Sequence, residues 1–140
     1  MRLFAVSAAL VLAATVTWAE DRSPSPAGAE VYIISPKDGA TVSSPFVMQF
    51  GLKGMGVAPA GVKFDGSGHH HLLIDSDPPT NLDAPLTADD QLIHFGKGQT
   101  QAVVTLPPGK HTLQLLMGDH NHKAHNPPVF SKKITVIVTK

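Results

Sequence analysis

Short runs of alternating apolar and polar residues, separated by Gly- and Pro-rich turns, recur along most of the chain. Such runs, rich in β-branched and aromatic residues, are typical of half-buried β-strands. Beyond the first 19 residues, no segment shows the 3.6-residue periodicity of an amphipathic helix. The pattern predicts strands at residues 30–35, 45–52, 69–75, 91–95, 100–106, 110–117 and 131–139.

Seven short strands with turn signals at this spacing predict an all-β fold, an immunoglobulin-like Greek-key β-sandwich of about seven strands. An open jelly roll or another Greek-key sandwich is the alternative. Successive strands of a seven-strand sandwich alternate in direction. The loops that follow the second, fourth and sixth strands are therefore expected at one end of the molecule.

The first 19 residues have the pattern of a secretory signal peptide. Arg2 supplies a positive charge, the apolar run LFAVSAALVLAATV is short for a membrane span, and cleavage is expected after Ala19. An uncleaved N-terminal anchor is the competing interpretation. Residues 20–29 (EDRSPSPAGA) have the composition of a flexible leader that does not pack, and 30–140 form the domain. The expected location is periplasmic or secreted, with no stable membrane insertion after cleavage.

The amino-acid composition limits the kinds of site and partner that the chain can have. The chain has no Cys, so an exported protein of this sequence has no disulfides, and any metal site must use His, Met, Asp or Glu. It carries 11 basic and 11 acidic residues, and this balance does not favour nucleic acid as a partner. Eight His among 140 residues are the anomaly that needs an explanation.

Three consecutive histidines lead into an apolar strand in GSGHHHLLID (66–75). Residues i and i+2 share one face of a strand, so His69 and His71 point together, while His70 points with the apolar side. The fold prediction brings this triplet to the same end as His94 and the loop segment HNHKAH (120–125). The predicted metal ligands are His69, His71, His94, His122 and His125.

Neutral imidazole is the commonest protein ligand for zinc, copper and nickel, and a Cys-rich structural zinc site is excluded. Met55 and Met117 are expected near the same end. Because thioether is a soft ligand that favours Cu(I), the sequence predicts copper ahead of zinc.

The histidines also allow a structural interpretation. Buried imidazoles can donate hydrogen bonds to backbone carbonyls, and His122 and His125 would then fasten their loop to the neighbouring strand. His111 is expected to be structural or exposed, His70 buried and hydrogen-bonded, and His120 a surface residue. The acidic segment 75–90 does not match a calcium loop and is expected to be solvated, and no nucleophile motif is present.

Four segments, SGHHHLLID, IHFGKGQT, LPPGKHTLQLLMGD and HNPPVFSKKITV, resemble the bacterial domain-of-unknown-function family 4399 (DUF4399) from about Gly61 to Val138. The resemblance implies a small exported protein and no particular activity. The family's histidine-bearing segments match here, without His120, at His69, His70, His71, His94, His111, His122 and His125.

The sandwich is also similar in outline to CopC-like copper carriers and copper–zinc superoxide dismutases. A CopC-like site would need a His at the mature N-terminus, where Glu20 stands, and a dismutase would need a guiding Arg near the metal. We therefore expect a non-catalytic periplasmic protein that sequesters or delivers copper, with the ion and a further periplasmic protein as partners. The alternatives are a metal-dependent redox or hydrolytic enzyme and an interaction domain with structural histidines. Structural histidines should be buried and paired with carbonyls.

Overall fold

Nine strands make up the regular structure in our computed structural model, which describes residues 21–140. The predicted signal peptide, residues 1–19, lies outside the described residues. Within 21–140 there is no helix, and so none long and apolar enough to cross a membrane. The strands are β1 (Glu30–Ser35), β2 (Thr41–Ser43), β3 (Phe46–Lys53), β4 (Gly56–Val57), β5 (Ser67–Ile74), β6 (Leu92–His94), β7 (Gln101–Val104), β8 (Gly109–Gly118) and β9 (Ile134–Thr139).

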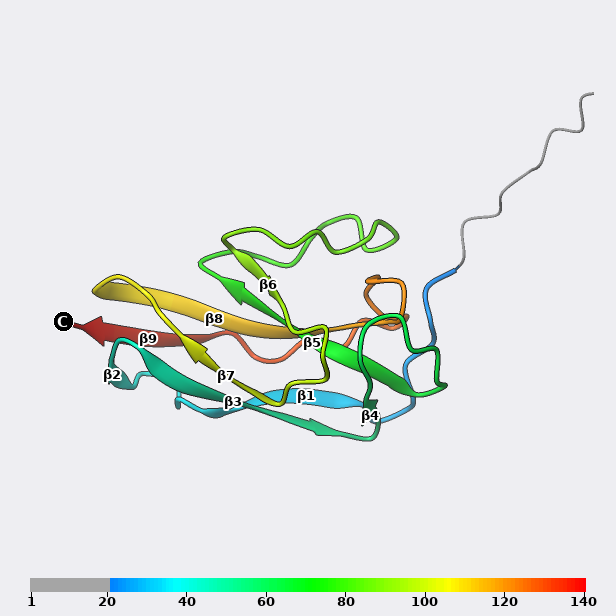
Figure 1. The fold of residues 1–140 in the computed structure, drawn as a ribbon, viewed down its shortest axis with the longest axis horizontal. Coiled ribbons are helices and arrows are strands. Elements are labelled where there is room, and N and C mark those ends of the chain that lie inside the picture. Colours follow the sequence, from blue (N-terminus) through cyan, green and yellow to red (C-terminus); the bar gives the residue numbers. More distant parts are fainter. Residues whose placement is uncertain (1–20) are drawn as a thin grey trace, which may run out of the picture.

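The strands form two packed sheets (Figure 1). The smaller sheet has the order β1-β3-β7, and the larger has the order β2-β9-β8-β5-β4, with β6 paired to β5. All pairs are antiparallel except β2–β9 and β4–β5. All seven predicted strands are present. The sequence did not predict β2 and β4, because two or three residues among turn signals show no periodicity.

The main core lies between the sheets. In β3, Phe46, Met48 and Phe50 are buried while Val47 and Gln49 are exposed, which is the alternation expected of a strand with one covered face. Leu113, Leu115 and Met117 face them from the larger sheet. Burial of each such side chain contributes roughly 1.5–3 kcal/mol, so the chain needs no disulfide to hold the layers together.

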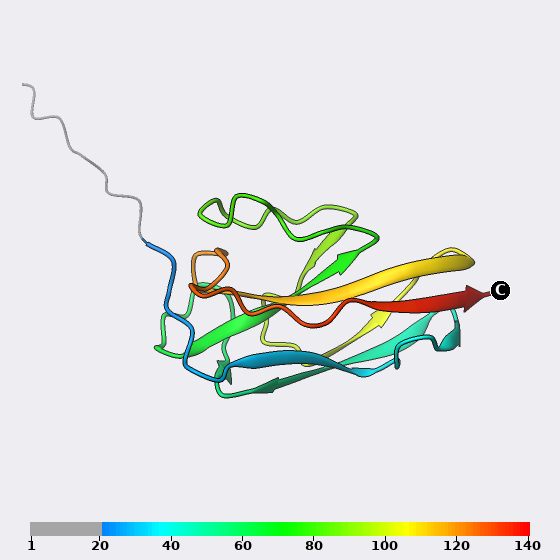
Figure 2. The same ribbon diagram turned by 180° about the vertical axis from the view of Figure 1, so that it is seen from behind.

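Strand β5 is buried along all eight residues, on both faces. Leu72 and Ile74 belong to the main core, whereas Leu73 belongs to a second apolar cluster with Leu86, Leu92, Leu116 and Ala124. That second cluster lies on the outer face of the larger sheet. It is covered there by the β5–β6 loop (75–91) and the β8–β9 loop (119–133), which lie on the same side of the sheet in both views (Figures 1 and 2).

Residues 22–25 hold the β8–β9 loop in place. The Arg22 side chain donates hydrogen bonds to the carbonyls of Ala124 and His125, and Ser25 N donates to Asn126 O. The expectation that residues 20–29 do not pack is therefore wrong for this stretch. Composition indicated a solvated leader, but the loop supplies carbonyl acceptors in an arrangement that no local pattern encodes.

Candidate metal centre

His69, His71 and His94 meet on the outer face of the larger sheet. His69 and His71 are two residues apart in β5, and the antiparallel register places His94 of β6 opposite His71. The sequence predicted a cluster built largely by loops at one end of the sandwich. The group instead lies on a sheet face, although near the point where β8 ends, because His69 is paired with Gly118. The pairing of β6 with β5 produces this difference.

The three imidazoles are close enough to share one ion. One ring nitrogen from each lies within 4.8 Å of the other two. The ring centroids are 4.8 Å apart for His69 and His71, 4.9 Å for His69 and His94, and 5.0 Å for His71 and His94. Among residues 21–140, no other group of three His, Asp or Glu side chains meets in this way.

The buried ring nitrogens of this group lack partners. His69 and His71 are fully buried, and neither ring nitrogen of either residue makes a hydrogen bond; Nε2 of His94 is also unpaired. A buried polar group without a partner costs about 1–3 kcal/mol. Unpaired buried donors and acceptors are rare in native structures, so several in one cluster mark these three residues as a group that could hold an ion.

Burial keeps these imidazoles neutral. It lowers the pKa of His69 to about 4 and that of His71 to about 3, and it also lowers the pKa of His94. The neighbouring rings add to the lowering, whereas the charge of Asp119 opposes it at His69 and the backbone of His69, too poorly placed for a hydrogen bond, opposes it at His71. Since metals bind the neutral ring, the ligands need no deprotonation at pH 7.

Gly118 makes room for the rings. A Cβ atom on this residue would lie 2.5 Å from Cε1 and 3.0 Å from Nδ1 of His71, and 3.4 Å from Nε2 of His69. Real Cβ contacts are essentially never as short as 2.5 Å, so the close approach of the His71 ring to β8 requires glycine here. The sequence analysis did not single out Gly118, because nothing local marks it.

His122, on the β8–β9 loop, lies beside this group. Its ring centroid is 4.8 Å from that of His94 and 5.3 Å from that of His69. Its backbone has a φ of 61°, a left-handed conformation that is uncommon for a residue with a side chain. Such backbone conformations are concentrated at ligand-binding positions.

Asp119 shapes the loop that carries His122. Its buried carboxylate accepts hydrogen bonds from the backbone N–H groups of Asn121 (2.9 Å), Lys123 (3.0 Å) and Ser23 (2.9 Å). Burial alone would raise the pKa of Asp119, but these donors lower it overall. Sequence reasoning missed this residue, although an Asp that begins a turn is the usual signal for such an arrangement.

His125 is placed differently. It is fully buried, and its Nε2 lies 3.0 Å from Ser67 O and its Nδ1 3.4 Å from Met117 O. Both ring nitrogens thus face carbonyl acceptors, as the structural interpretation expects of a residue that fastens its loop to β5 and β8. The structure does not bring His125 into the group of three.

His70 faces the main core, tilted against Phe50 with centroids 5.1 Å apart, on the side expected for it. Its ring nitrogens make no hydrogen bond, although the backbone of Gln99 opposes the lowering of its pKa to about 4 by burial. Within residues 21–140, His70 does not belong to a group of three side chains that could hold an ion. Met117 is buried in this same core and Met55 packs against it, so neither thioether lies on the face of His69 and His71. The expectation that these methionines join the site is not supported.

His120 and His111 lie apart from the group. His120 is partly buried, with Nδ1 3.5 Å from Ser23 Oγ. His111 lies 2.7 Å from Asp75 Oδ2 through Nδ1 and 2.8 Å from Pro107 O through Nε2, in line with the structural role expected for it.

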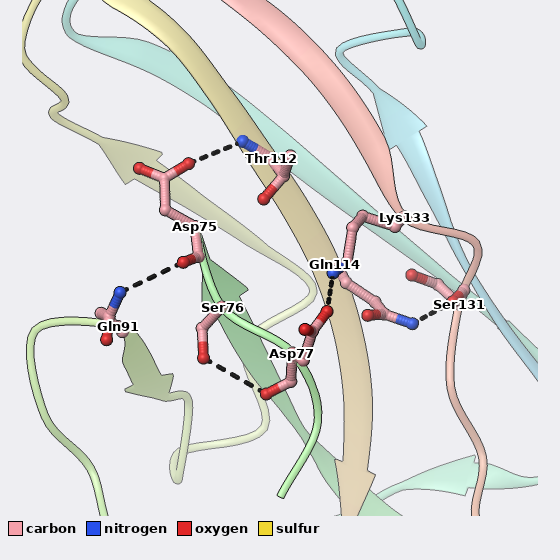
Figure 3. A network of polar contacts seen from close by, with 8 residues as sticks. All are labelled: Asp75, Ser76, Asp77, Gln91, Thr112, Gln114, Ser131 and Lys133. Carbon is pink, nitrogen blue, oxygen red and sulfur yellow. Dashed lines mark hydrogen bonds and ion pairs between the residues drawn. The ribbon is translucent and has the colours of Figure 1, made fainter.

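Polar contacts fix the base of the β5–β6 loop on β8 and on the end of the β8–β9 loop (Figure 3). Asp75 Oδ1 accepts a hydrogen bond of 2.8 Å from Thr112 N, and Asp77 pairs with Lys133. Ser131 O accepts a hydrogen bond from Gln114 Nε2. The segment predicted to be a solvated acidic loop is thus anchored at its start. Farther along the same loop, Leu86 packs in the second apolar cluster, and its N–H donates to His122 O.

A model of the Domain of unknown function (DUF4399) family matches residues 48–139, more than half of the chain. The chain belongs to the DUF4399 family. The matched segment contains all eight histidines and every element of the candidate metal centre except Arg22 and Ser23. Comparison with curated proteins and with solved structures gave no match.

Proposed function

We propose that this DUF4399 protein binds one transition-metal ion, copper ahead of zinc, and that its role is sequestration or delivery of that ion outside the cytoplasm. The observation that carries the proposal is the set of unpaired, buried ring nitrogens of His69, His71 and His94. An ion would bind one nitrogen of each ring and offset the cost of burying it.

The proposed ligand set consists of the three strand-borne histidines and His122. An ion holds its nitrogen ligands about 2.0 Å away, so neighbouring nitrogens lie roughly 2.8 Å apart around a square-planar ion such as Cu(II) and roughly 3.3 Å apart around a tetrahedral ion such as Zn(II). The nitrogens of His69, His71 and His94 lie within 4.8 Å of one another, so ring movements on the order of an ångström close the group around an ion. His125 is left out because both its nitrogens face carbonyls.

Imidazole donors alone favour a divalent ion. The argument for Cu(I) depended on thioether ligands, and Met55 and Met117 belong to the opposite face of β5. Cu(II) and Zn(II) both accept imidazole, and a given nitrogen site generally binds Cu(II) more tightly. Copper therefore remains the proposed ion, in its divalent state, with zinc as the alternative.

Burial of the ligands favours a protein that carries the ion over an enzyme that uses it in catalysis. His69 and His71 are fully buried, and Leu116, a member of the second apolar cluster, is the cross-strand partner of His71. An enzyme needs an open metal position that a substrate can reach. The structural alternative explains His125 and His111, whose nitrogens face acceptors, but it leaves His69 and His71 without partners.

The location and the finer fold type are also proposals. The N-terminal signal pattern supports an exported, periplasmic or secreted protein. The immunoglobulin-like assignment is supported by the division of β1, β3 and β7 from β5, β8 and β9, with the fourth predicted strand, β6, added beside β5.

Metal titration of the untagged chain without its predicted signal peptide tests the function. The protein is stripped with a chelator and titrated with Cu(II), Zn(II) and Cu(I) against a competing indicator. We expect one ion per chain, bound most tightly as Cu(II). A His69→Ala/His71→Ala variant should lose this binding, and His111→Ala, which removes an imidazole outside the group, should keep it. Equal, weak binding by all three proteins would overturn the proposal.

A further inference from the structure

His122 differs from the other three histidines in how its backbone is held. His69, His71 and His94 are fixed by the β-ladders of β5, β6 and β8. His122 is carried by the β8–β9 loop and is only partly buried, as is His94. The less covered side of the cluster is therefore the side where His94 and His122 lie, with their ring centroids 4.8 Å apart.

The turn around His122 lies outside the β-ladders and is held by hydrogen bonds on both sides of that residue. His122 N donates to Asp119 O at 2.9 Å, and His122 O accepts from Leu86 N at 2.6 Å, which joins the two covering loops. The Asp119 carboxylate holds the turn through Asn121 N and Lys123 N. A short turn pinned at Asp119 can move its tip without breaking a β-ladder.

We propose that His122 is the closing ligand of the metal centre. In this inference, which rests on the proposed metal function, His69, His71 and His94 form a cradle that exists before the ion binds. The ion enters on the side of His94 and His122, and His122 then binds it as the fourth ligand. His122 therefore sets how long the ion stays, and Asp119 is the positioning residue that holds His122 over the cradle.

The test compares ion release from loaded protein. Asparagine tolerates a left-handed backbone, so His122→Asn removes the imidazole with little strain. We expect the Cu(II) of His122→Asn to pass to saturating EDTA at least tenfold faster than that of the wild type. The imidazole count from pulsed electron paramagnetic resonance should fall from four to three. His122→Gly, which also suits a positive φ, repeats the test if the first variant does not fold.

Two further variants separate the roles of the loop residues. His120→Asn removes an imidazole from the same loop and should release the ion at the wild-type rate with four imidazoles bound. Asp119→Asn should keep four imidazoles yet release the ion faster than the wild type, because it weakens the anchor and not the ligand set.

Failure of this inference is distinguishable from failure of the proposed function. If the wild type binds no stoichiometric ion, or keeps it after loss of His69 and His71, the proposed function fails. If that binding holds but His122→Asn releases the ion at the wild-type rate with an unchanged imidazole count, only the closing role of His122 is overturned. Release of the ion from Asp119→Asn at the wild-type rate would overturn the positioning role of Asp119.

Discussion

His71 of β5 and His94 of β6 are cross-strand partners, with their Cα atoms opposite each other in the antiparallel register and their ring centroids 5.0 Å apart. His69 joins them because residues i and i+2 share a face of the strand. One strand pair therefore brings these three imidazoles together, and the β8–β9 loop adds His122 beside them. The group of three should consequently be as rigid as the sheet, and the cost of burying its rings should lower the free energy of unfolding of the metal-free protein.

The buried, unpaired imidazole of His71 should make the metal-free protein less stable than it could be. We expect His71→Leu to raise the free energy of unfolding of the metal-free protein by about 1–3 kcal/mol, because leucine has no ring nitrogens to desolvate. The same variant should gain little stability from added Cu(II). Urea unfolding with and without the ion measures both effects, and a destabilised variant that the ion still protects would contradict the assignment.

The lowered pKa values of the cluster predict how stability depends on pH without metal. Below about pH 6.5 the unfolded chain protonates its histidines, whereas His69 and His71 stay neutral in the fold down to about pH 4 and 3. The unfolded state then binds more protons, so the free energy of unfolding should fall as pH falls through this range. Each histidine contributes at most about 1.4 kcal/mol per pH unit. Urea unfolding of His71→Leu should show a shallower dependence; an unchanged slope would argue against a buried neutral His71.

Gly118→Ala tests the close approach of the rings to β8. The added Cβ would lie 2.5 Å from His71 Cε1, so His71 has to shift. We expect at least a tenfold loss of Cu(II) affinity in a competition titration and a destabilisation of about 1–3 kcal/mol. Gly56→Ala is the matched control, because its new Cβ would meet only the Ser67 Cβ at 4.0 Å. Equal affinities for the two variants would show that ring placement does not depend on Gly118.

The Asp75–His111 pair predicts a second pH effect, far from the metal centre. Both ring nitrogens of His111 face acceptors, and only the protonated ring can donate to both. The pKa of His111 is raised, chiefly by its hydrogen bond to Asp75. Burial alone would raise the pKa of Asp75, but the hydrogen bonds from His111 and Thr112 lower that pKa overall. The stability from charged His111 is complete below about pH 6.5 and is lost as pH rises through the raised pKa. Asp75 contributes above about pH 4 and loses this contribution as pH falls.

The measurement is urea unfolding of wild type and His111→Ala at about pH 5 and pH 9. We expect the free energy of unfolding of the wild type to exceed that of His111→Ala by about 1 kcal/mol more at about pH 5 than at about pH 9. The value is modest because 42% of the Asp75 side chain is exposed. Subtracting the two proteins cancels the contribution of the metal cluster. A difference that does not change with pH would mean that His111 is held as a neutral ring.

The sequence predicted the strands well because alternation and turn residues are local signals. The same i and i+2 rule correctly separated His69 and His71 from His70. It could not reveal that β6 pairs with β5, since strand pairing depends on packing across the whole sandwich. That pairing moved the site from a loop-built end to a sheet face.

Long-range contacts also explain why the sequence analysis misplaced some residues and missed others. His125 sits in a histidine-rich segment like His122, yet its neighbours turn out to be two carbonyls. Met117 was expected near the histidines. Side chains alternate along β8, however, and the Met117 side chain points into the main core. Gly118 makes room for the ring of His71 on the neighbouring strand, and Asp119 holds the loop that carries His122. Neither relationship is visible in the local sequence pattern.

The contacts of Arg22 and Ser23 with the β8–β9 loop also concern how the protein is made. These residues follow closely after the predicted cleavage site, and they hold the Ala124 and His125 carbonyls and the Asp119 carboxylate. The sandwich itself begins at β1, but the functional unit begins several residues earlier. A protease that trimmed the leader to Glu30 would leave both sheets whole while removing the contacts of Arg22 and Ser23 that hold the loop over the histidines. Under the proposed function, such trimming would release the ion from a chain that is still folded.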